Sequence, residues 1–513
     1  MIYTPRNVSL LLGTLLLAAC NDASIRKLIP PAFAGAEVLE GAEAPQDTVP
    51  SEPAIPDPRQ SAPEHIRGIY LTAYTAGSAT RLPQLLELAA RTELNTFVVD
   101  MKTEQGIHYR SEIPLGQQLA RQGHVPIRDL KALADTLHAH GIHTIARIVV
   151  FKDPILSKAK PEWSIKRPDG SVWVDKAGNT WVSAWEPAVW EYNLQIAEEA
   201  ARAGWKEIQF DYIRFPEPYK SLPPQIHPKA KGSRTDAIQG FLAEAKRRIH
   251  PLGATVAADV FGLAMNESRD VGIGQQWEAL SGTVDHILPM VYPSHYFPTH
   301  LRGVPRPNRM PYETVYTSVG MGVIRNQRIA EAGARPARII PWLQAFSAPW
   351  VDKNFPYGPE QARAQIKAVH DLGLEDWIFW DPFVRYERME AGFAPATASR
   401  GKPWQPSAEM VSIVDRFDRE GAEAERERIV AAAGGAPFRP VATQQAVAAQ
   451  SPVVMQTPAP PQSPTPAATE PKRESAAAKP QPKASAKPKP KPSTPRLLGV
   501  PVQPAATAPD SVR

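Results

Sequence analysis

The chain has 513 residues and a formal net charge of +5 at pH 7. Nine Lys or Arg stand against three Asp or Glu in residues 441–513, a balance of +6, so the remainder of the chain is near −1. Nucleic-acid-binding domains carry a basic surplus, and this distribution excludes one on the part of the chain that precedes residue 441.

The N-terminal segment is typical of an exported protein. Arg6 precedes an apolar stretch over residues 10–19, which is too short to span a bilayer. Leu17-Ala18-Ala19 stands directly before Cys20, the single cysteine, and resembles a bacterial lipoprotein signal over residues 1–19. We expect acyl chains on Cys20 to anchor the protein to the cell envelope. An ordinary signal peptide with a chance cysteine is the alternative, and both readings predict export.

Two further segments lack the composition of a folded domain. Residues 20–63 are rich in Pro, Ala and Glu, and residues 436–513 are rich in Pro, Ala and Lys. Such segments bury too little apolar surface to offset their ordering entropy, so we expect a disordered linker and a disordered tail. The basic tail is either a solvated spacer or a contact for anionic lipid, nucleic acid or acidic wall polymer.

Residues 64–435 alternate between short β-rich runs and amphipathic stretches. The eight β-rich runs cover 68–74, 96–102, 143–151, 207–215, 255–262, 286–293, 338–346 and 376–381, and helical patterns cover 82–91, 127–140, 190–203, 235–249, 359–372 and, as a terminal brace, 408–433. Eight such strands predict an α/β fold, a (β/α)8 TIM barrel. An open doubly wound sheet is the alternative, but no Gly-rich phosphate loop follows Tyr74 or Lys102.

The loop after the third run, residues 152–189, carries four of the twelve tryptophans: Trp163, Trp173, Trp181 and Trp185. We expect a β-hairpin excursion over the barrel mouth. Its tryptophans suit two roles equally, either stacking platforms for sugar rings or a small satellite core under the loop.

Strand alternation predicts which side chains enter the barrel, because successive residues point to opposite faces. Phe97, Val99 and Met101 share one face of their run, and Asp100 and Lys102 share the other. The bulky apolar faces suit the outer helices. The polar faces point inward near the C-terminal mouth, where barrel enzymes keep their catalytic groups. In the other runs the same phase points these side chains inward: Arg147, Asp211, Asp259, Met290, Tyr292, Trp342 and Gln344.

Asp211 and Asp259 form the best candidate pair of catalytic carboxyls, because both end neighbouring strands and point inward. Glycosidic hydrolysis needs one carboxyl to protonate the leaving oxygen and another to attack the sugar or activate water. We expect Arg214 to hold Asp211 ionised, as nucleophile or base, and Asp259 to be the acid. The structural alternative is an internal salt bridge of Asp211 with Arg214 or Arg147.

Other polar and aromatic side chains at the strand ends are candidates for substrate binding. Asp100 and Lys102 either bind sugar hydroxyls or pair with each other, and Asp381 has the same two options. The candidate substrate-binding residues are Tyr74, Asp100, Lys102, Arg147, Arg214, Tyr292, His295, Trp342, Gln344, Trp380 and Asp381.

Four segments together resemble a bacterial family of glycoside-hydrolase-like proteins: Phe210–Pro216, Pro289–Tyr296, Pro341–Phe346 and the loop Pro168–Trp190. The resemblance covers about residues 65–390. It implies a glycosidase-like (β/α)8 barrel with Asp211 as the prime catalytic candidate. Trp380-Asp381-Pro382 is more acidic than the family pattern, which affects the subsite at the eighth strand end.

The sequence favours an exported, lipid-anchored glycoside hydrolase acting on an envelope or extracellular polysaccharide. A non-catalytic glycan-binding lipoprotein is the alternative, and a metal-dependent carbohydrate deacetylase is a third possibility. No metal-binding motif, nucleophile elbow or phosphate loop is found. We therefore expect no metal and no cofactor, and, beyond the polysaccharide and the membrane anchor, no nucleic-acid partner.

Overall fold

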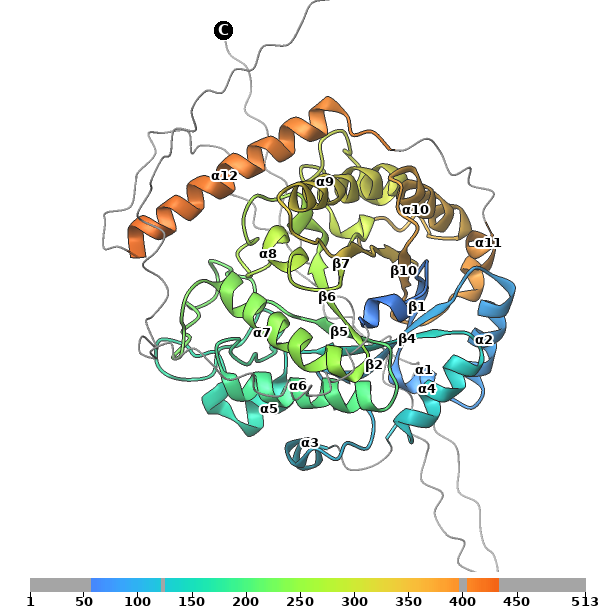
Figure 1. Ribbon diagram of the computed structural model, residues 1–513, viewed down its shortest axis with the longest axis horizontal. Coiled ribbons are helices and arrows are strands. Elements are labelled where there is room, and N and C mark those ends of the chain that lie inside the picture. Colours follow the sequence, from blue (N-terminus) through green and yellow to red (C-terminus); the bar gives the residue numbers. More distant parts are fainter. Residues whose placement is uncertain (1–56, 121–124, 396–403, 433–513) are drawn as a thin grey trace, which may run out of the picture. The chain divides into compact units, whose positions relative to one another are not determined.

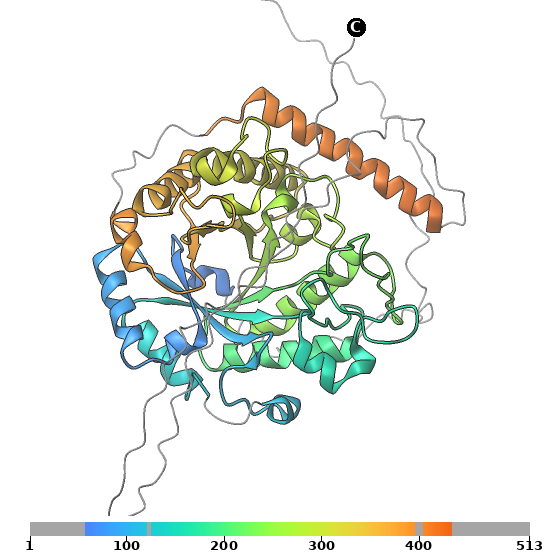
Figure 2. The same ribbon diagram turned by 180° about the vertical axis from the view of Figure 1, so that it is seen from behind.

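The computed structural model describes residues 57–120, 125–395 and 404–432, with side chains described as far as residue 421. The chain divides into two compact units, residues 1–458 and 459–513, and everything described lies in the first. There, parallel strands form a closed barrel with helices ringed around it (Figure 1 and, from behind, Figure 2). The predicted (β/α)8 barrel is confirmed.

Eight parallel strand positions make up the barrel wall. They are β1 (Arg67–Leu71), β2 (Thr96–Thr103), β4 (His143–Val149), β5 (Glu207–Asp211), β6 (Thr255–Phe261), β7 (His286–Met290), the pair β8 (Arg338–Ile339) and β9 (Trp342–Gln344), and β10 (Trp377–Trp380). Pairing of β1 with both β10 and β2 closes the ring. β8 and β9 both pair with β7, and Pro341 between them has no N–H to donate to the ladder. The short β3 (Gly106–Ile107) pairs antiparallel with β2.

Two separate apolar clusters follow from the strand alternation. Phe97 and Val99 belong to the larger cluster, which lies between the strands and the helices. Val98, between them in sequence, belongs to a smaller cluster with Ile145, Ala257 and other side chains of the barrel interior. The predicted inward and outward faces are thus confirmed for the fifth strand and, as far as Asp100, for the second.

The helices lie outside the strands. They are α1 (Ala73–Ala76), α2 (Arg81–Arg91), α3 (Pro114–Leu119), α4 (Leu130–Ala139), α5 (Pro154–Ala159), α6 (Pro187–Arg202), α7 (Arg234–Ile249), α8 (Trp277–Ser281), α9 (Pro311–Glu331), α10 (Pro359–Asp371), α11 (Glu390–Phe393) and α12 (Ala408–Ala432). Short 3-10 helices are η1 (Pro58–Ser61), η2 (Pro161–Trp163), η3 (His250–Leu252), η4 (Gly262–Met265), η5 (Pro293–His295), η6 (Pro307–Arg309) and η7 (Glu387–Met389). None of the helices in the described part is long and apolar enough to cross a membrane.

Helix α9 has no counterpart among the predicted helices, although it has 21 residues. Its glycines weaken the helical pattern, and packing explains them. A Cβ on Gly320 would lie 2.3 Å from the terminal methyl of Met410 on α12, and one on Gly322 would lie 2.6 Å from the sulfur of Met265. The missing side chains let α12 pack against α9, and Arg328 of α9 forms ion pairs with α12 as well. The predicted terminal brace is therefore present.

The segment after β4 is only in part the expected hairpin. It begins with α5, and isolated antiparallel bridges then join Ser164 to Val182, Lys166 to Val172 and Val174 to Thr180. Trp173 and Trp181 are 1% exposed and belong to the larger apolar cluster. These two tryptophans thus pack with the main core, and not in the separate satellite core that was one of the two expectations.

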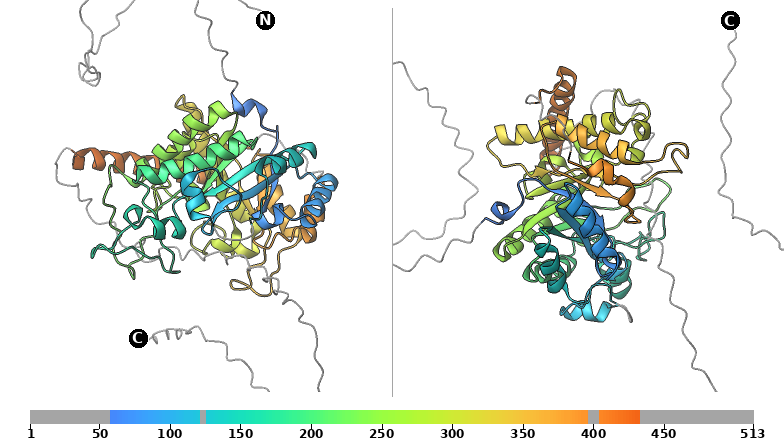
Figure 3. Two further views of the ribbon diagram at one scale, coloured as in Figure 1. Left: turned by 90° about the horizontal axis from the view of Figure 1, so that it is seen from below. Right: turned by 90° about the vertical axis from the view of Figure 1, so that its right-hand side faces the viewer.

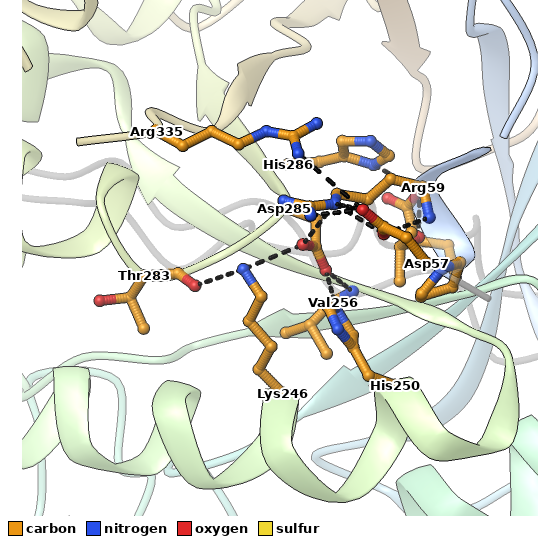
Figure 4. A network of polar contacts seen from close by, with 12 residues as sticks. Asp57, Arg59, Lys246, His250, Val256, Thr283, Asp285, His286 and Arg335 are labelled. Atoms are coloured by element: carbon orange, nitrogen blue, oxygen red, sulfur yellow. Dashed lines mark hydrogen bonds and ion pairs between the residues drawn. The ribbon is translucent and has the colours of Figure 1, made fainter. Parts of the chain in front are cut away.

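The N-terminal ends of the strands carry a charged network that fixes the first described residues (Figure 4). Asp285 precedes β7 and accepts hydrogen bonds from the Val256 N–H at 2.9 Å and the His250 ring at 2.7 Å. Lys246 lies 3.0 Å from the same carboxylate, and Arg59 of η1 lies 3.9 Å from it. Figure 3 shows η1, in blue, at the opposite end of the barrel from the loops that follow β7 and β9.

Candidate active site

A cavity of about 560 Å³ opens at the C-terminal ends of the strands. Of the thirteen candidates for catalysis and substrate binding, eight line it: Arg147, Asp211, Arg214, Asp259, Tyr292, His295, Trp342 and Trp380. These side chains come from six strands or the loops that follow them, so the barrel closure brings them together. The site lies at the end where barrel enzymes carry their chemistry.

Asp211 is the last residue of β5 and lies against Arg147 of the neighbouring strand β4. The Nε of Arg147 is 3.0 Å from Oδ2 of Asp211, and a second guanidinium nitrogen contacts the same oxygen. The other oxygen accepts a hydrogen bond of 2.5 Å from the N–H of Tyr212. Paired charge-assisted hydrogen bonds of this kind stabilise the ionised carboxylate.

Arg147 also holds a second carboxylate, below the cavity. Its Nη1 is 2.5 Å from Oδ1 of Asp100, whose Oδ2 accepts a 2.5 Å hydrogen bond from the hydroxyl of Tyr70. Burial opposes the charge of Arg147, but Asp211 and Asp100 outweigh it and raise the pKa of the guanidinium. A Tyr70–Asp100–Arg147–Asp211 chain therefore fixes the position of the catalytic candidate from beneath.

Asp259, at the inner face of β6, has a different environment. Its side chain is 1% exposed, and Oδ1 accepts hydrogen bonds from Nε2 of Gln209 at 2.8 Å and Nε1 of Trp342 at 2.7 Å. Its Oδ2 lies 4.0 Å from Nε of Arg147. Burial raises the pKa of Asp259 well above its usual value, the nearby Asp211 charge raises it further, and Arg147 and Trp342 oppose this shift only in part.

The two carboxyls therefore have different environments within one cavity. Asp211 is paired with Arg147, while burial raises the pKa of Asp259. Since both donors occupy Oδ1 of Asp259, a proton on this carboxyl belongs on Oδ2. Two carboxyls whose environments push their protonation apart form the arrangement expected of an acid and a base or nucleophile.

Arg214 lies in the cavity but does not contact Asp211, so its predicted role of holding that charge is corrected. β5 ends at Asp211, and the next residue, Tyr212, has φ 48°. This left-handed turn, costly for a non-glycine residue, redirects the chain, and the strand alternation does not continue to residue 214. The Arg214 guanidinium instead donates to the Phe215 carbonyl at 2.9 Å and lies 3.3 Å from Glu217. It also packs over the rings of Phe261, Trp181 and Tyr212.

Lys102 does not enter the barrel, contrary to expectation. The β2–β4 register shifts between Asp100 and Lys102, and this bulge turns the lysine to the outer face. Its ammonium is 2.8 Å from Asp153 and donates to the Val149 carbonyl at 2.6 Å. The expected Asp100–Lys102 pair is therefore absent.

The remaining candidates lie outside the cavity lining. Asp100 is beneath it, as described above. Gln344 is fully buried and joins two loops, accepting from the Ser294 N–H at 3.0 Å and donating to the Phe346 carbonyl at 2.9 Å. Asp381 is fully buried too, accepts from the Phe383 N–H at 2.9 Å and forms an ion pair with Arg388. Tyr74 is 44% exposed.

Cys20, the expected lipidation site, lies outside the described residues.

Several cavity residues were not predicted, among them Asp175, Lys176 and Tyr219. Trp181 is the one tryptophan of the loop after β4 in the lining; its indole donates to Asp175, another lining residue, at 3.0 Å. Gln209 shares the inward face of its strand with Asp211, two residues away, and lies outside the cavity lining, where it donates to Asp259 at 2.8 Å. The described residues contain no cluster of three or more His, Cys, Asp or Glu suited to a metal ion.

Comparisons with known proteins place this geometry in context. A family model described as "Putative glycosyl hydrolase domain" matches residues 68–386. No curated protein matches the chain. Among solved structures, a hypothetical protein from Ruminiclostridium thermocellum ATCC 27405 is 36% identical, with coverage of 38% of this chain and 97% of that one, at a TM-score of 0.35.

Two glycosidases also overlay on the chain. The alpha-galactosidase TtGalA from Thermus thermophilus is 12% identical over 69% of this chain and 61% of its own, at a TM-score of 0.39. Alpha-L-fucosidase isoenzyme 2 from Paenibacillus thiaminolyticus is 16% identical over 71% of this chain and 50% of its own, at a TM-score of 0.41. These overlays carry no argument about activity. The family match spans more than half of the chain, and the protein therefore belongs to the glycosyl hydrolase-like family that this model describes.

Proposed function

We propose that the protein is a glycoside hydrolase that cleaves a glycosidic bond in an envelope or extracellular polysaccharide, with Asp259 as general acid and Asp211 as nucleophile or base. One observation carries the proposal: two carboxyls share a cavity of about 560 Å³ in different environments, Asp211 paired with Arg147 and Asp259 buried with a raised pKa.

The reaction would use the two carboxyls in different roles. Oδ2 of Asp259 transfers its proton to the leaving glycosidic oxygen as the bond to the anomeric carbon breaks. Asp211 supplies an electron pair, either directly to that carbon or by taking a proton from an attacking water. Arg147 pairs with the Asp211 carboxylate, and Trp342 and Gln209 keep the acid in one orientation.

The test is a comparison of the full chain with its Asp211→Asn and Asp259→Asn variants on bacterial exopolysaccharides and peptidoglycan. Release of reducing ends should occur with the wild-type chain and fall by several orders of magnitude in both variants, because each removes one half of the acid–base pair. The proposal is wrong if the wild-type chain releases no more than the variants on every polymer tested.

A non-catalytic glycan-binding protein is the second candidate, and one observation favours it. The bidentate contact with Arg147 occupies Oδ2 of Asp211, which leaves only Oδ1 for chemistry. In that case Asp211→Asn would leave glycan affinity intact. Neither the wild-type chain nor any variant would then cleave any of the polymers.

We also propose that the chain is exported and anchored to the cell envelope through acylated Cys20, with residues 1–19 as the signal, 20–63 as a linker and 436–513 as a tail. The lipobox-like Leu17-Ala18-Ala19-Cys20 supports this. Metabolic labelling with a tritiated fatty acid should mark the wild-type protein in the membrane fraction and not Cys20→Ser. Equal labelling of both would refute acylation at this residue.

A further inference from the structure

A continuous row of aromatic rings leads from the cavity to the protein surface. Tyr292 and Trp380 line the cavity, with ring centroids 5.4 Å apart. Phe346 lies 5.3 Å from Trp380, and Trp350 lies 6.1 Å from Phe346 with the ring planes 12° apart. The row joins the cavity that holds the carboxyls to a side chain on the rim.

Trp350 is unusual because it is 44% exposed. Its ring plane is nearly parallel to that of Phe346, and part of the indole surface remains open to solvent. A large apolar side chain left open beside a cavity is informative, whereas a scattered exposed leucine is not. An open, flat ring face next to a proposed glycan site suits the apolar face of a sugar ring.

Two more exposed rings lie on the same side of the mouth. Phe383 is 40% exposed and follows β10, and Tyr74 is 44% exposed and follows β1. The strands β9, β10 and β1 are consecutive in the barrel, while the carboxyls lie on β5 and β6 on the opposite side of the ring. A glycan that reached from the carboxyls to these rings would cross the mouth.

We propose that Trp350, together with Phe383 and Tyr74, forms a distal glycan subsite that stacks on sugar rings beyond the bond that is cleaved, so that the substrate is a chain of several sugars. The subsite rests on the proposed function for the identity of its ligand. Its occupant is the same glycan chain that enters the cavity, because the ring row is continuous with the cavity lining.

The test separates binding from cleavage. Full-length Asp211→Asn protein is run in native gels that contain hydroxyethylcellulose, chitosan, alginate or soluble starch, alone and combined with Trp350→Ala or Trp350→Phe. At least one polymer should retard Asp211→Asn. Trp350→Ala should weaken that binding about tenfold, equivalent to ~1.4 kcal/mol, and Trp350→Phe should keep most of it.

A matched control is Phe297→Ala. Phe297 is also an exposed ring at the mouth, 36% exposed, but it follows β7 outside the β9–β10–β1 sector. It should bind as the parent does. Equal binding by Trp350→Ala and the parent, or no retardation by any of the four polymers, overturns the subsite.

The two proposals fail in different ways. Binding that needs Trp350, without hydrolysis by the wild-type chain, refutes the hydrolase and keeps the subsite. Hydrolysis of a long polymer with the same KM in wild-type and Trp350→Ala protein keeps the hydrolase and refutes the subsite.

Discussion

The hydrogen bond from the Trp342 indole to Asp259 gives the sharpest prediction about catalysis. The donor is 2.7 Å from Oδ1 of a carboxyl whose side chain is 1% exposed, and it lowers a pKa that burial has raised. Trp342→Phe keeps a ring in place and removes the donor. Because the lost bond favours the ionised form, the pKa of Asp259 should rise further.

The magnitude follows from the chemistry of the bond. A hydrogen bond to a charged group contributes about 1.5 kcal/mol or more to its stability, and one pKa unit corresponds to ~1.36 kcal/mol. The shift should therefore be about one unit upward. An acid works only while protonated, so activity should persist to a pH about one unit higher than in the wild-type chain.

The assay is the pH dependence of kcat/KM on the most rapidly cleaved polymer, which reports the groups of the free enzyme. Trp380→Phe is the matched control, because Trp380 also lines the cavity while the bond to Asp259 comes from Trp342. In Trp380→Phe, the basic limb of the pH profile of kcat/KM should stay at the wild-type pH, even if the rate falls. A basic limb that stays or moves down in Trp342→Phe would refute the assignment of Asp259 as the acid.

Three further predictions concern buried charges. Arg147→Met should abolish hydrolysis and cost at least ~3 kcal/mol of unfolding free energy, because Asp100 and Asp211 lose their shared partner; an unchanged denaturation midpoint would contradict this. Lys102→Met should destabilise the fold by ~3–5 kcal/mol through the unpaired Asp153 yet leave kcat/KM unchanged, since Lys102 lies outside the cavity; a changed KM would return it to the substrate site. Burial lowers the pKa of His286, but the charge of Glu207 outweighs burial and raises it above the ordinary His value. The pair therefore stabilises the fold fully below the ordinary His pKa, and this stabilisation is lost as the pH rises through the raised pKa. Glu207→Gln should then lower Tm more at about pH 5.5 than at about pH 8.5, and an equal loss at both would contradict the pairing.

The fold was predictable because its signals are repeated. All eight predicted strand runs contain a barrel strand, and the alternation that placed Val98 inside and Phe97 outside holds wherever the strand is regular. Helix α9 was not predictable, because Gly320 and Gly322 look unfavourable until their packing partners on other elements are known.

The sequence placed the acidic pair and Arg147 correctly, but it was wrong about Lys102 and about the contact of Arg214 with Asp211. Asp211 and Asp259 lie on regular strands, so counting residues was enough to place both in the cavity. Lys102 follows a bulge and Arg214 follows a left-handed residue, and each irregularity redirects the side chains after it. Single-chain alternation carries no signal for either, because both depend on the neighbouring strand or loop.

The position of η1 has a practical consequence. The described chain joins the barrel beside Asp285, at the end away from the cavity. Coupling to beads through η1 itself would hold the barrel by that end, so the bound protein should still reach long insoluble polymers, whereas coupling through the loop that carries Trp350 should hinder them.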